Sequence, residues 1–237
     1  MICSGGLGVQ TWTELDDRHV TLVVPVGSVE QHGPHLPLDT DTRIAGAVAN
    51  GARSALGDDE EMLIAPALAY GASGEHEDFP GTVSIGHEAL RLVLVEYGRS
   101  ACRWAARIVF VNGHGGNVPT LVDAVGLLRD EGRDVAWFPC AVAGADAHAG
   151  ATETALLLYI SRDLVRSDAV AVGNTGAVAD LMPRLRSAGV RAVSPNGVLG
   201  DPRRGDPGDG RAHLDAMSTR LAAALRRWSP DDHGMLR

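Results

Sequence analysis

The segment GSVEQHGPHLPLDTD, at residues 27–41, gathers histidine and carboxylate side chains directly after an apolar run. Glu30 and His32 lie two residues apart, so they point to the same side of an extended backbone. Asp41 follows at the start of an expected helix, where an anionic side chain is favoured. A polar turn with an aspartate cap is the structural alternative. The density of imidazole and carboxylate groups favours a site for Zn²⁺, Mn²⁺ or Fe²⁺.

A second segment, VNGHGGN at residues 111–117, surrounds His114 with glycines. Glycine allows a close approach of the backbone, and N–H groups ahead of a helix suit an anionic oxygen. Gly115 and Gly116 are therefore candidates for binding substrate. The spacing differs from Gly-x-Gly-x-x-Gly, which disfavours a dinucleotide site.

A third segment, HAGATET at residues 148–154, opens another expected helix. His148 and Glu153 flank a glycine there and could simply cap the helix or belong to the core. Because two other clusters of ligand-type residues accompany them, an acid–base or metal-binding role is favoured.

A fourth segment, YGASGEHEDFPGT at residues 70–82, is a long polar loop. It could be a plain connection, but loops of this kind often close over substrates. Ser73, Glu75 and His76 are therefore candidates for binding substrate.

Strands that alternate with helices predict an α/β fold with a mostly parallel sheet covered on both faces. Short β-branched runs predict strands at residues 20–26, 62–66, 107–111 and 135–138. Apolar spacing predicts helices at residues 42–56, 89–106, 118–129, 154–160 and 211–228. Residues 201–210 are expected to form a surface loop, and the chain from 229 a frayed tail. In such folds ligands bind at the carboxyl ends of strands, where the four segments lie.

Composition limits the class of protein. The 237 residues carry a formal net charge of −9 and are 45% hydrophobic, which is ordinary for one globular domain spanning residues 1–237. The acidic balance argues against nucleic acid as a partner, and no apolar run is long enough to span a membrane. Three scattered cysteines and a start without signal-peptide features favour the cytoplasm. The absence of lysine excludes Schiff-base chemistry.

Together, the four segments resemble the creatininase (creatinine amidohydrolase) family, in the order in which that family carries them. The resemblance covers about residues 22–164. It implies a three-layer α/β/α sandwich with a mostly parallel sheet, assembled as a homo-oligomer such as a hexamer or octamer. It also implies two divalent metal ions per subunit that activate water to hydrolyse an amide C–N bond.

The resemblance also implies roles for individual residues. Glu30 resembles a ligand to one metal ion, together with His114, and His32 resembles a ligand to the other. Asp41 resembles the carboxylate that bridges the two ions, and His148 resembles the catalytic histidine, which would protonate the leaving nitrogen.

The sequence departs from true creatininases at one point. Those enzymes carry a Tyr-Glu pair where this chain has Gly115 and Gly116, and the glutamate ligates the second metal ion. Creatinine is therefore a doubtful substrate, and the site has room for something larger. Glu153 is the nearest motif carboxylate that could replace the missing ligand, with a helix cap or a hydrogen bond to a ligand as the alternatives.

Within the family, the sequence is most similar to the branch found in mycofactocin systems, through stretches such as GLLRDEGRD and SPNGVLGDP. That similarity implies a peptidase that releases the modified C-terminal Val-Tyr-derived unit from a precursor peptide. An amidohydrolase or deformylase acting on a small cyclic amide or formamide is the alternative enzyme. A non-catalytic metal-binding protein is a further alternative, which His148 argues against.

Overall fold

The strands form one parallel sheet whose carboxyl ends lie level with one another. The computed structural model describes residues 6–16, 18–57 and 61–237. Within them the sheet has the order β2-β1-β3-β4, and all its pairings are parallel. The strands are β1 (Thr21–Val26), β2 (Met62–Ile64), β3 (Arg107–Asn112) and β4 (Val135–Pro139). Val26 pairs with Asn112, and Asn112 with Pro139, so the segments that follow β1 and β3 leave the sheet side by side.

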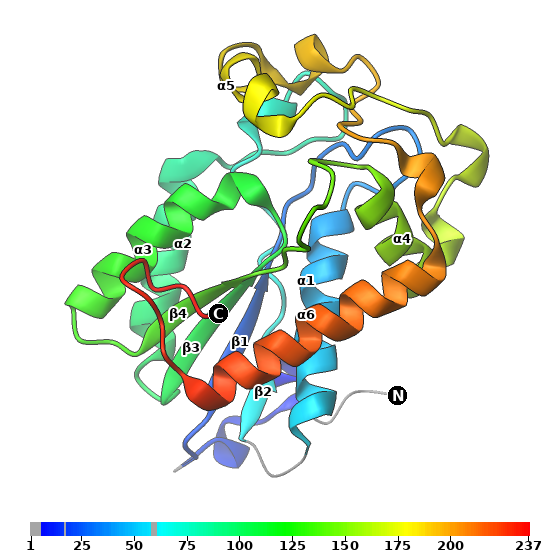
Figure 1. The fold of residues 1–237 in the computed structure, drawn as a ribbon. Coiled ribbons are helices and arrows are strands. Elements are labelled where there is room, and N and C mark those ends of the chain that lie inside the picture. The colour runs from blue at the N-terminus through cyan, green and yellow to red at the C-terminus, as the bar shows by residue number, and fades with distance from the viewer. Residues whose placement is uncertain (1–5, 17, 58–60) are drawn as a thin grey trace.

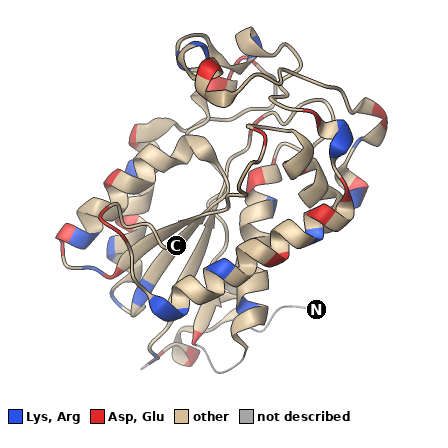
Figure 2. Cartoon of the chain, in the orientation of Figure 1, with Lys and Arg blue, Asp and Glu red and all other residues tan. Residues whose placement is uncertain are grey.

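Helices cover both faces of this sheet (Figure 1). Alternate side chains of β1 enter two separate cores, with Val23 on one face and Leu22 and Val24 on the other. The first core contains side chains of α1 (Thr40–Leu56) and α6 (Pro207–Arg227), and the second those of α2 (Gly86–Ala101) and α3 (Val118–Asp130). This arrangement confirms the predicted three-layer sandwich. Figure 2 shows that positions with charged residues of both signs are spread along the helices and loops.

Two further helices flank the carboxyl end of the sheet. Helix α4 (Ala151–Ile160) packs against α6, and α5 (Val178–Val193) packs on the 3-10 turn η3 (Gly74–His76). The α5 contacts form a small core of their own, which includes Val190 and the loop residue Phe79. The sequence patterns did not predict α5. None of the described helices has the length and apolarity needed to cross a membrane.

Several helix boundaries differ from those predicted, because polar residues extend the helices. The expected surface loop at residues 201–210 is wrong, since α6 already begins at Pro207. Its preceding residue, Asp206, accepts a hydrogen bond from the Gly208 N–H, and proline suits a first helical position. Helix α4 begins three residues earlier than predicted, where Asp146 accepts hydrogen bonds from its first backbone N–H groups.

The C-terminal tail is ordered rather than frayed. The Trp137 N–H in β4 donates to the Gly234 carbonyl at 2.9 Å, and the Leu236 N–H donates back to Trp137 at 2.8 Å. Leu236 itself is 1% exposed. The tail therefore pairs with the edge strand β4, a way of covering backbone groups that would otherwise be open to another chain.

Candidate metal centre and active site

The predicted site residues meet at the carboxyl end of the sheet. Each of the five strongest candidates is at most 8% exposed: Glu30, His32, Asp41, His114 and His148. Glycine makes this convergence possible, because a Cβ on Gly113 would lie 2.3 Å from the Asp41 carbonyl oxygen. The start of α1 can therefore pack directly against the end of β3. As a result, the aspartate of one segment lies beside the histidine of another.

The first cluster consists of Glu30, Asp41 and His114, whose ligand atoms all lie within 4.8 Å of one another. The Nδ1 atom of His114 is 3.2 Å from Glu30 Oε1 and 3.3 Å from Asp41 Oδ2. On the other side of the ring, Nε2 lies 3.1 Å from the Ala72 carbonyl oxygen, which accepts its proton. In the neutral ring, Nδ1 is then an acceptor facing two carboxylate oxygens. Three acceptors that face one another favour a proton or a metal cation between them.

The second cluster repeats this arrangement with His32, Asp41 and Glu153. His32 Nδ1 lies 3.2 Å from the main-chain oxygen of Glu30 and donates to it. The opposite nitrogen, Nε2, is 3.1 Å from Asp41 Oδ1 and 3.9 Å from Glu153 Oε2. Asp41 therefore offers one oxygen to each cluster. Ser28 Oγ donates to Asp41 Oδ2 at 2.6 Å and so orients the shared carboxylate.

The electrostatics of both clusters fit divalent cations. Glu30 is fully buried, yet neither of its carboxylate oxygens accepts a hydrogen bond from any residue that the structure describes. Burial would lower the pKa of His32, but the carboxylates of Asp41, Glu153 and Glu30 together outweigh burial and raise that pKa to about 10. For His114, burial is likewise outweighed, mainly by Glu30, and the pKa rises well above its ordinary value. Both clusters thus favour positive charge among oxygen and imidazole ligands, the chemistry of a divalent-metal site.

His148 presents an unprotonated nitrogen to the first cluster. Its Nε2 lies 2.8 Å from the Gln31 carbonyl oxygen and donates to it, which leaves Nδ1 as an acceptor 3.8 Å from Glu30 Oε1. Burial, together with the neighbouring His32 and His76, lowers the pKa of His148 well below its ordinary value. The neutral ring can therefore accept a proton at Nδ1 but holds none there to donate.

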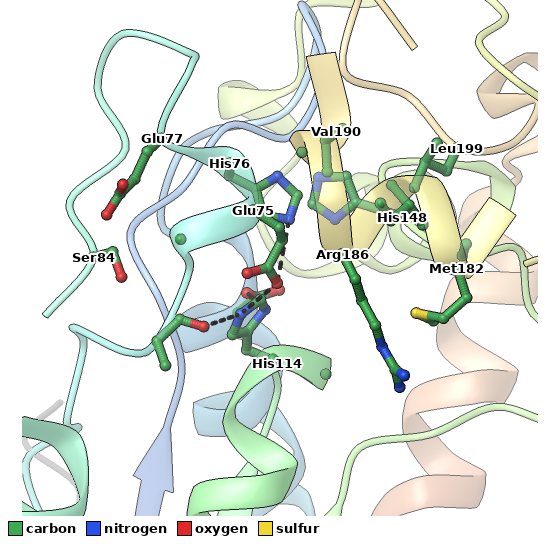
Figure 3. Close-up of a pocket in the computed structure, with 18 of the residues that line it drawn as sticks. Glu75, His76, Glu77, Ser84, His114, His148, Met182, Arg186, Val190 and Leu199 are labelled. Carbon is green, nitrogen blue, oxygen red and sulfur yellow. Dashed lines mark hydrogen bonds and ion pairs between the residues drawn. The ribbon is translucent and has the colours of Figure 1, made fainter. Parts of the chain in front are cut away.

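A cavity of about 700 Å³ opens over these residues (Figure 3). Among the predicted substrate-binding residues, four line it: Glu75, His76, Gly115 and Gly116. Ser73 does not line it, and its side chain is fully buried. The side chains of Glu75 and His76 lie close to His114 and His148 in Figure 3.

Residues that the sequence analysis missed complete the cavity. Met182 and Arg186 point from α5 across the cavity from Glu75, and Leu199 lies beside His148 (Figure 3). The only sequence signal for the α5 side chains was their spacing of four residues, which places them on one helix face. Gln31, which stands between two candidate ligands, gave no signal because it is neither acidic nor a metal ligand type.

The two glycines after His114 occupy different surroundings. A Cβ on Gly116 would lie 2.4 Å from His114 Nε2 and 2.8 Å from Glu75 Oε1, whereas one on Gly115 would meet no atom within 4 Å from the described residues beyond its chain neighbours. Glu75 therefore takes part of the space that a side chain at position 116 would need. The open position at Gly115 widens the cavity.

This contrast predicts different effects of one added methyl group. Gly116→Ala should displace the His114 ring and weaken metal binding by about 10–100-fold, as expected when the support of a ligand is disturbed. Gly115→Ala is the matched control and should bind metal normally. Titration of the metal-free proteins with Zn²⁺ measures both affinities. Equal affinities would show that the His114 ring tolerates the contact.

Glu153 makes contacts that bear on both roles considered for it. Its Oε2 accepts a hydrogen bond from the Ala149 N–H at 2.6 Å and lies 3.9 Å from His32 Nε2. Burial raises the pKa of Glu153 to about 7 although His32 acts in the opposite direction. The side chain thus holds the turn before α4 and also faces the second cluster.

The ligand role of Glu153 predicts a loss of one metal ion. Glu153→Gln keeps an oxygen for the Ala149 N–H but removes the negative charge beside His32, so bound metal should fall by about half. Glu77→Gln, the same change in another residue lining the cavity, should leave metal content unchanged. Elemental analysis of the dialysed proteins compares them. Full metal occupancy in Glu153→Gln would leave only the hydrogen-bonding role.

Comparison with known proteins identifies the family. The family model of creatininase, described as creatinine amidohydrolase, matches residues 9–225. This chain belongs to the creatininase family. A curated creatinine amidohydrolase of Pseudomonas putida is 30% identical over 69% of this chain and 75% of its own length. Membership confirms the predicted resemblance and makes the chain a hydrolase.

One group of creatininase-family relatives is much more similar. The "Mycofactocin precursor peptide peptidase" of Mycolicibacterium smegmatis is 57% identical over 98% of this chain and 94% of its own length. A nucleotide deformylase of Methanothermobacter thermautotrophicus, described as "2-amino-5-formylamino-6-ribosylaminopyrimidin-4(3H)-one 5'-monophosphate deformylase", is 35% identical over 74% of this chain and 71% of its own length.

Solved creatininase structures share the fold. One described as "Creatininase Mn" and a mutant described as "Zn-Zn type" each superpose with a TM-score of 0.81 at 26% identity. Each alignment covers 96% of this chain and 99% of the other. The metals in those descriptions agree with the divalent-cation chemistry of the two clusters.

Proposed function

We propose that this creatininase-family hydrolase is a metal-dependent peptidase that releases the modified C-terminal Val-Tyr-derived unit from the mycofactocin precursor peptide. The observation that carries the proposal is the 57% identity to a mycofactocin precursor peptide peptidase along 98% of the chain. Identity to the creatinine amidohydrolase and to the deformylase is far lower, at 30% and 35%.

The proposed cofactor is a pair of divalent ions, Zn²⁺, Fe²⁺ or Mn²⁺. Glu30, His114 and Asp41 would hold one, and His32, Asp41 and Glu153 the other, in agreement with the two clusters of ligand atoms. Bound there, the ions would polarise the scissile carbonyl and lower the pKa of the attacking water.

The proton transfers fall to His148. Because its Nδ1 is unprotonated at rest, the ring first accepts a proton from the attacking water and then passes it to the leaving nitrogen. This order refines the role expected from the sequence, in which the histidine only protonates the leaving group. The main-chain N–H groups of Gly115 and Gly116, which line the cavity, are the candidate donors to the carbonyl oxygen.

The cavity supports a substrate larger than creatinine. Its volume of about 700 Å³ lies in the range that encloses drug-sized ligands. The leaving nitrogen must lie near His148, whose main chain is hydrogen-bonded to Leu199 at 2.8 Å. Leu199 and Val190 make this side of the cavity apolar, which suits a Val-Tyr-derived leaving unit.

Mass spectrometry of reactions with three substrates tests the proposed function. The purified protein, loaded with Zn²⁺, Fe²⁺ or Mn²⁺ in turn, is incubated with the modified precursor peptide, with creatinine and with a formamide. We expect release of the Val-Tyr-derived unit from the peptide, and its loss after chelation of the metal. Hydrolysis of creatinine or the formamide without cleavage of the peptide would instead support an amidohydrolase or a deformylase.

The proposed assembly is a homo-oligomer, such as a hexamer or octamer. Two adjacent apolar residues of α2, Leu92 and Val93, are 62% and 40% exposed in the single chain, as expected for side chains that another subunit covers. Light scattering on the purified protein measures the subunit number directly. A monomer at micromolar concentration would contradict this part of the proposal.

A further inference from the structure

The side chain of Gln31 joins three segments of the site. Its Nε2 lies 2.8 Å from His76 Nδ1 and 3.1 Å from the Gly197 carbonyl oxygen, while its Oε1 accepts from the Gly33 N–H at 2.9 Å. If the amide nitrogen and oxygen were exchanged, Oε1 would face the Gly197 carbonyl oxygen, which is also an acceptor. Nε2 would then face the Gly33 N–H, which is also a donor. These neighbours therefore fix the orientation of the amide.

The fixed amide determines which nitrogen of His76 carries the proton. An amide N–H can only donate, so His76 Nδ1 must accept, and the ring proton lies on Nε2. That Nε2 atom faces Glu30 Oε1 at 3.3 Å. His76 therefore presents an N–H group to the carboxylate that belongs to the first metal cluster.

The main chain of the same residue determines the opposite state of His148. The Gln31 carbonyl accepts the proton of His148 Nε2, so Nδ1 is unprotonated. The side-chain nitrogen of Gln31 also lies 3.0 Å from His148 Nε2, but both of its protons already go to His76 and Gly197. The rings of His76 and His148 lie together, with centroids 4.4 Å apart.

We propose that Gln31 is a positioning residue of the reaction, which holds His76 as a proton donor and His148 as a proton acceptor at the same face of the cavity. The inference rests on the proposed function, because it takes His148 as the carrier of the proton. Of the two rings, His76 depends on the Gln31 side chain, whereas His148 depends on its carbonyl. Side-chain substitutions should therefore change the state of His76 first.

The absence of a side chain at Gly197 leaves the space that the Gln31 amide occupies. Its φ angle is +79°, and a Cβ there would lie 1.8 Å from Gln31 Oε1. An alanine at this position must displace the amide, because the three atoms nearest to its Cβ all belong to the Gln31 side chain. Gly197→Ala therefore displaces the Gln31 side chain without changing Gln31 itself, and provides a second variant for the test.

Kinetics and metal content form the first arm of the test. Gln31→Met removes both donated hydrogen bonds at similar side-chain volume, and kcat for the precursor peptide should fall by about 10–100-fold with an unchanged KM. Gly197→Ala should have a similar effect. Gly132→Ala is its matched control, because Gly132 has a φ of +81° and a Cβ there would meet no other part of the described structure within 4 Å. Retained metal with a lower kcat supports positioning, whereas a kcat equal to that of the unchanged protein overturns it.

Solid-state ¹⁵N NMR of histidine-labelled, zinc-loaded protein forms the second arm, which needs no substrate. Gln31→Glu replaces the amide donor by a carboxylate acceptor, so the proton of His76 should move from Nε2 to Nδ1. The His76 signal is identified by its loss in the His76→Asn variant. His32 and His114, whose protons go to main-chain carbonyls, should keep theirs. An unchanged His76 would overturn the proposal. If the unchanged protein cleaves no peptide, the proposed function fails, while this spectrum still decides the role of Gln31.

Discussion

Asp41→Asn is expected to remove bound metal from both clusters and to reduce hydrolysis to the level of the metal-free protein. Asp41 is the residue common to the two clusters, with Oδ1 3.1 Å from His32 Nε2 and Oδ2 3.3 Å from His114 Nδ1. Asparagine offers only one oxygen as a ligand, and its amide NH₂ group cannot coordinate a metal ion. Elemental analysis and peptide turnover measure the two effects.

Asp39→Asn provides the matched control, because it makes the same change two residues earlier. Asp39 is partly exposed and pairs with Arg43 at 2.7 Å, on the outer side of the same helix start. This variant should retain metal and activity. Asp41→Asn that folds and still carries both ions would disprove the bridging role.

His148→Ala is expected to lower kcat by about 10²–10⁴-fold while both metal ions stay bound. The ring offers its unprotonated Nδ1 to the cavity, and its lowered pKa, caused by burial and then by His32 and His76, keeps it neutral. Alanine removes the carrier of the proton but none of the carboxylates. Single-turnover kinetics on the precursor peptide separate this loss from slower product release.

The same variant also tests a competing role. A ring nitrogen of His148 lies within 4.8 Å of ligand atoms of Glu30 and His32, so a loss of metal would identify the ring as a ligand. His87→Ala is the control, because His87 lines the same cavity while its ring is hydrogen-bonded to the Thr120 hydroxyl. Near-normal kcat in His148→Ala would leave the histidine a structural role.

Local patterns predicted the sheet and the convergence of the candidate ligands. The runs at residues 20–26 and 107–111 correspond to β1 and β3, and a parallel sheet places both of their carboxyl ends at one edge. That geometry brings Glu30 Oε1 to 3.2 Å from His114 Nδ1, although the two residues lie 84 positions apart in the chain. Spacing and residue type were sufficient to predict this convergence, because a parallel sheet always places the carboxyl ends of its strands at the same edge.

Other features depend on contacts that no local pattern records. Helix α5 contains Pro183 and is kinked at Gly189, whose φ of 71° interrupts the helical periodicity, and its core includes the loop residue Phe79. The C-terminal tail looks polar, yet Leu236 is held by Trp137, which lies 99 residues earlier. The protonation of His114 depends on a carbonyl 42 residues away. Each feature arises from a distant neighbour rather than from its own segment.

Three of the histidines in the site are oriented by peptide carbonyls, those of Glu30, Gln31 and Ala72. A point mutation exchanges a side chain but leaves the main-chain carbonyl in place. The orientation of these rings therefore depends on the backbone and not on the side chains of Glu30, Gln31 and Ala72. Protein engineering can therefore vary the surface that meets the substrate without rebuilding the reactive centre. Gly115 and Met182 are suitable positions for such libraries, since both line the cavity and neither belongs to a metal cluster.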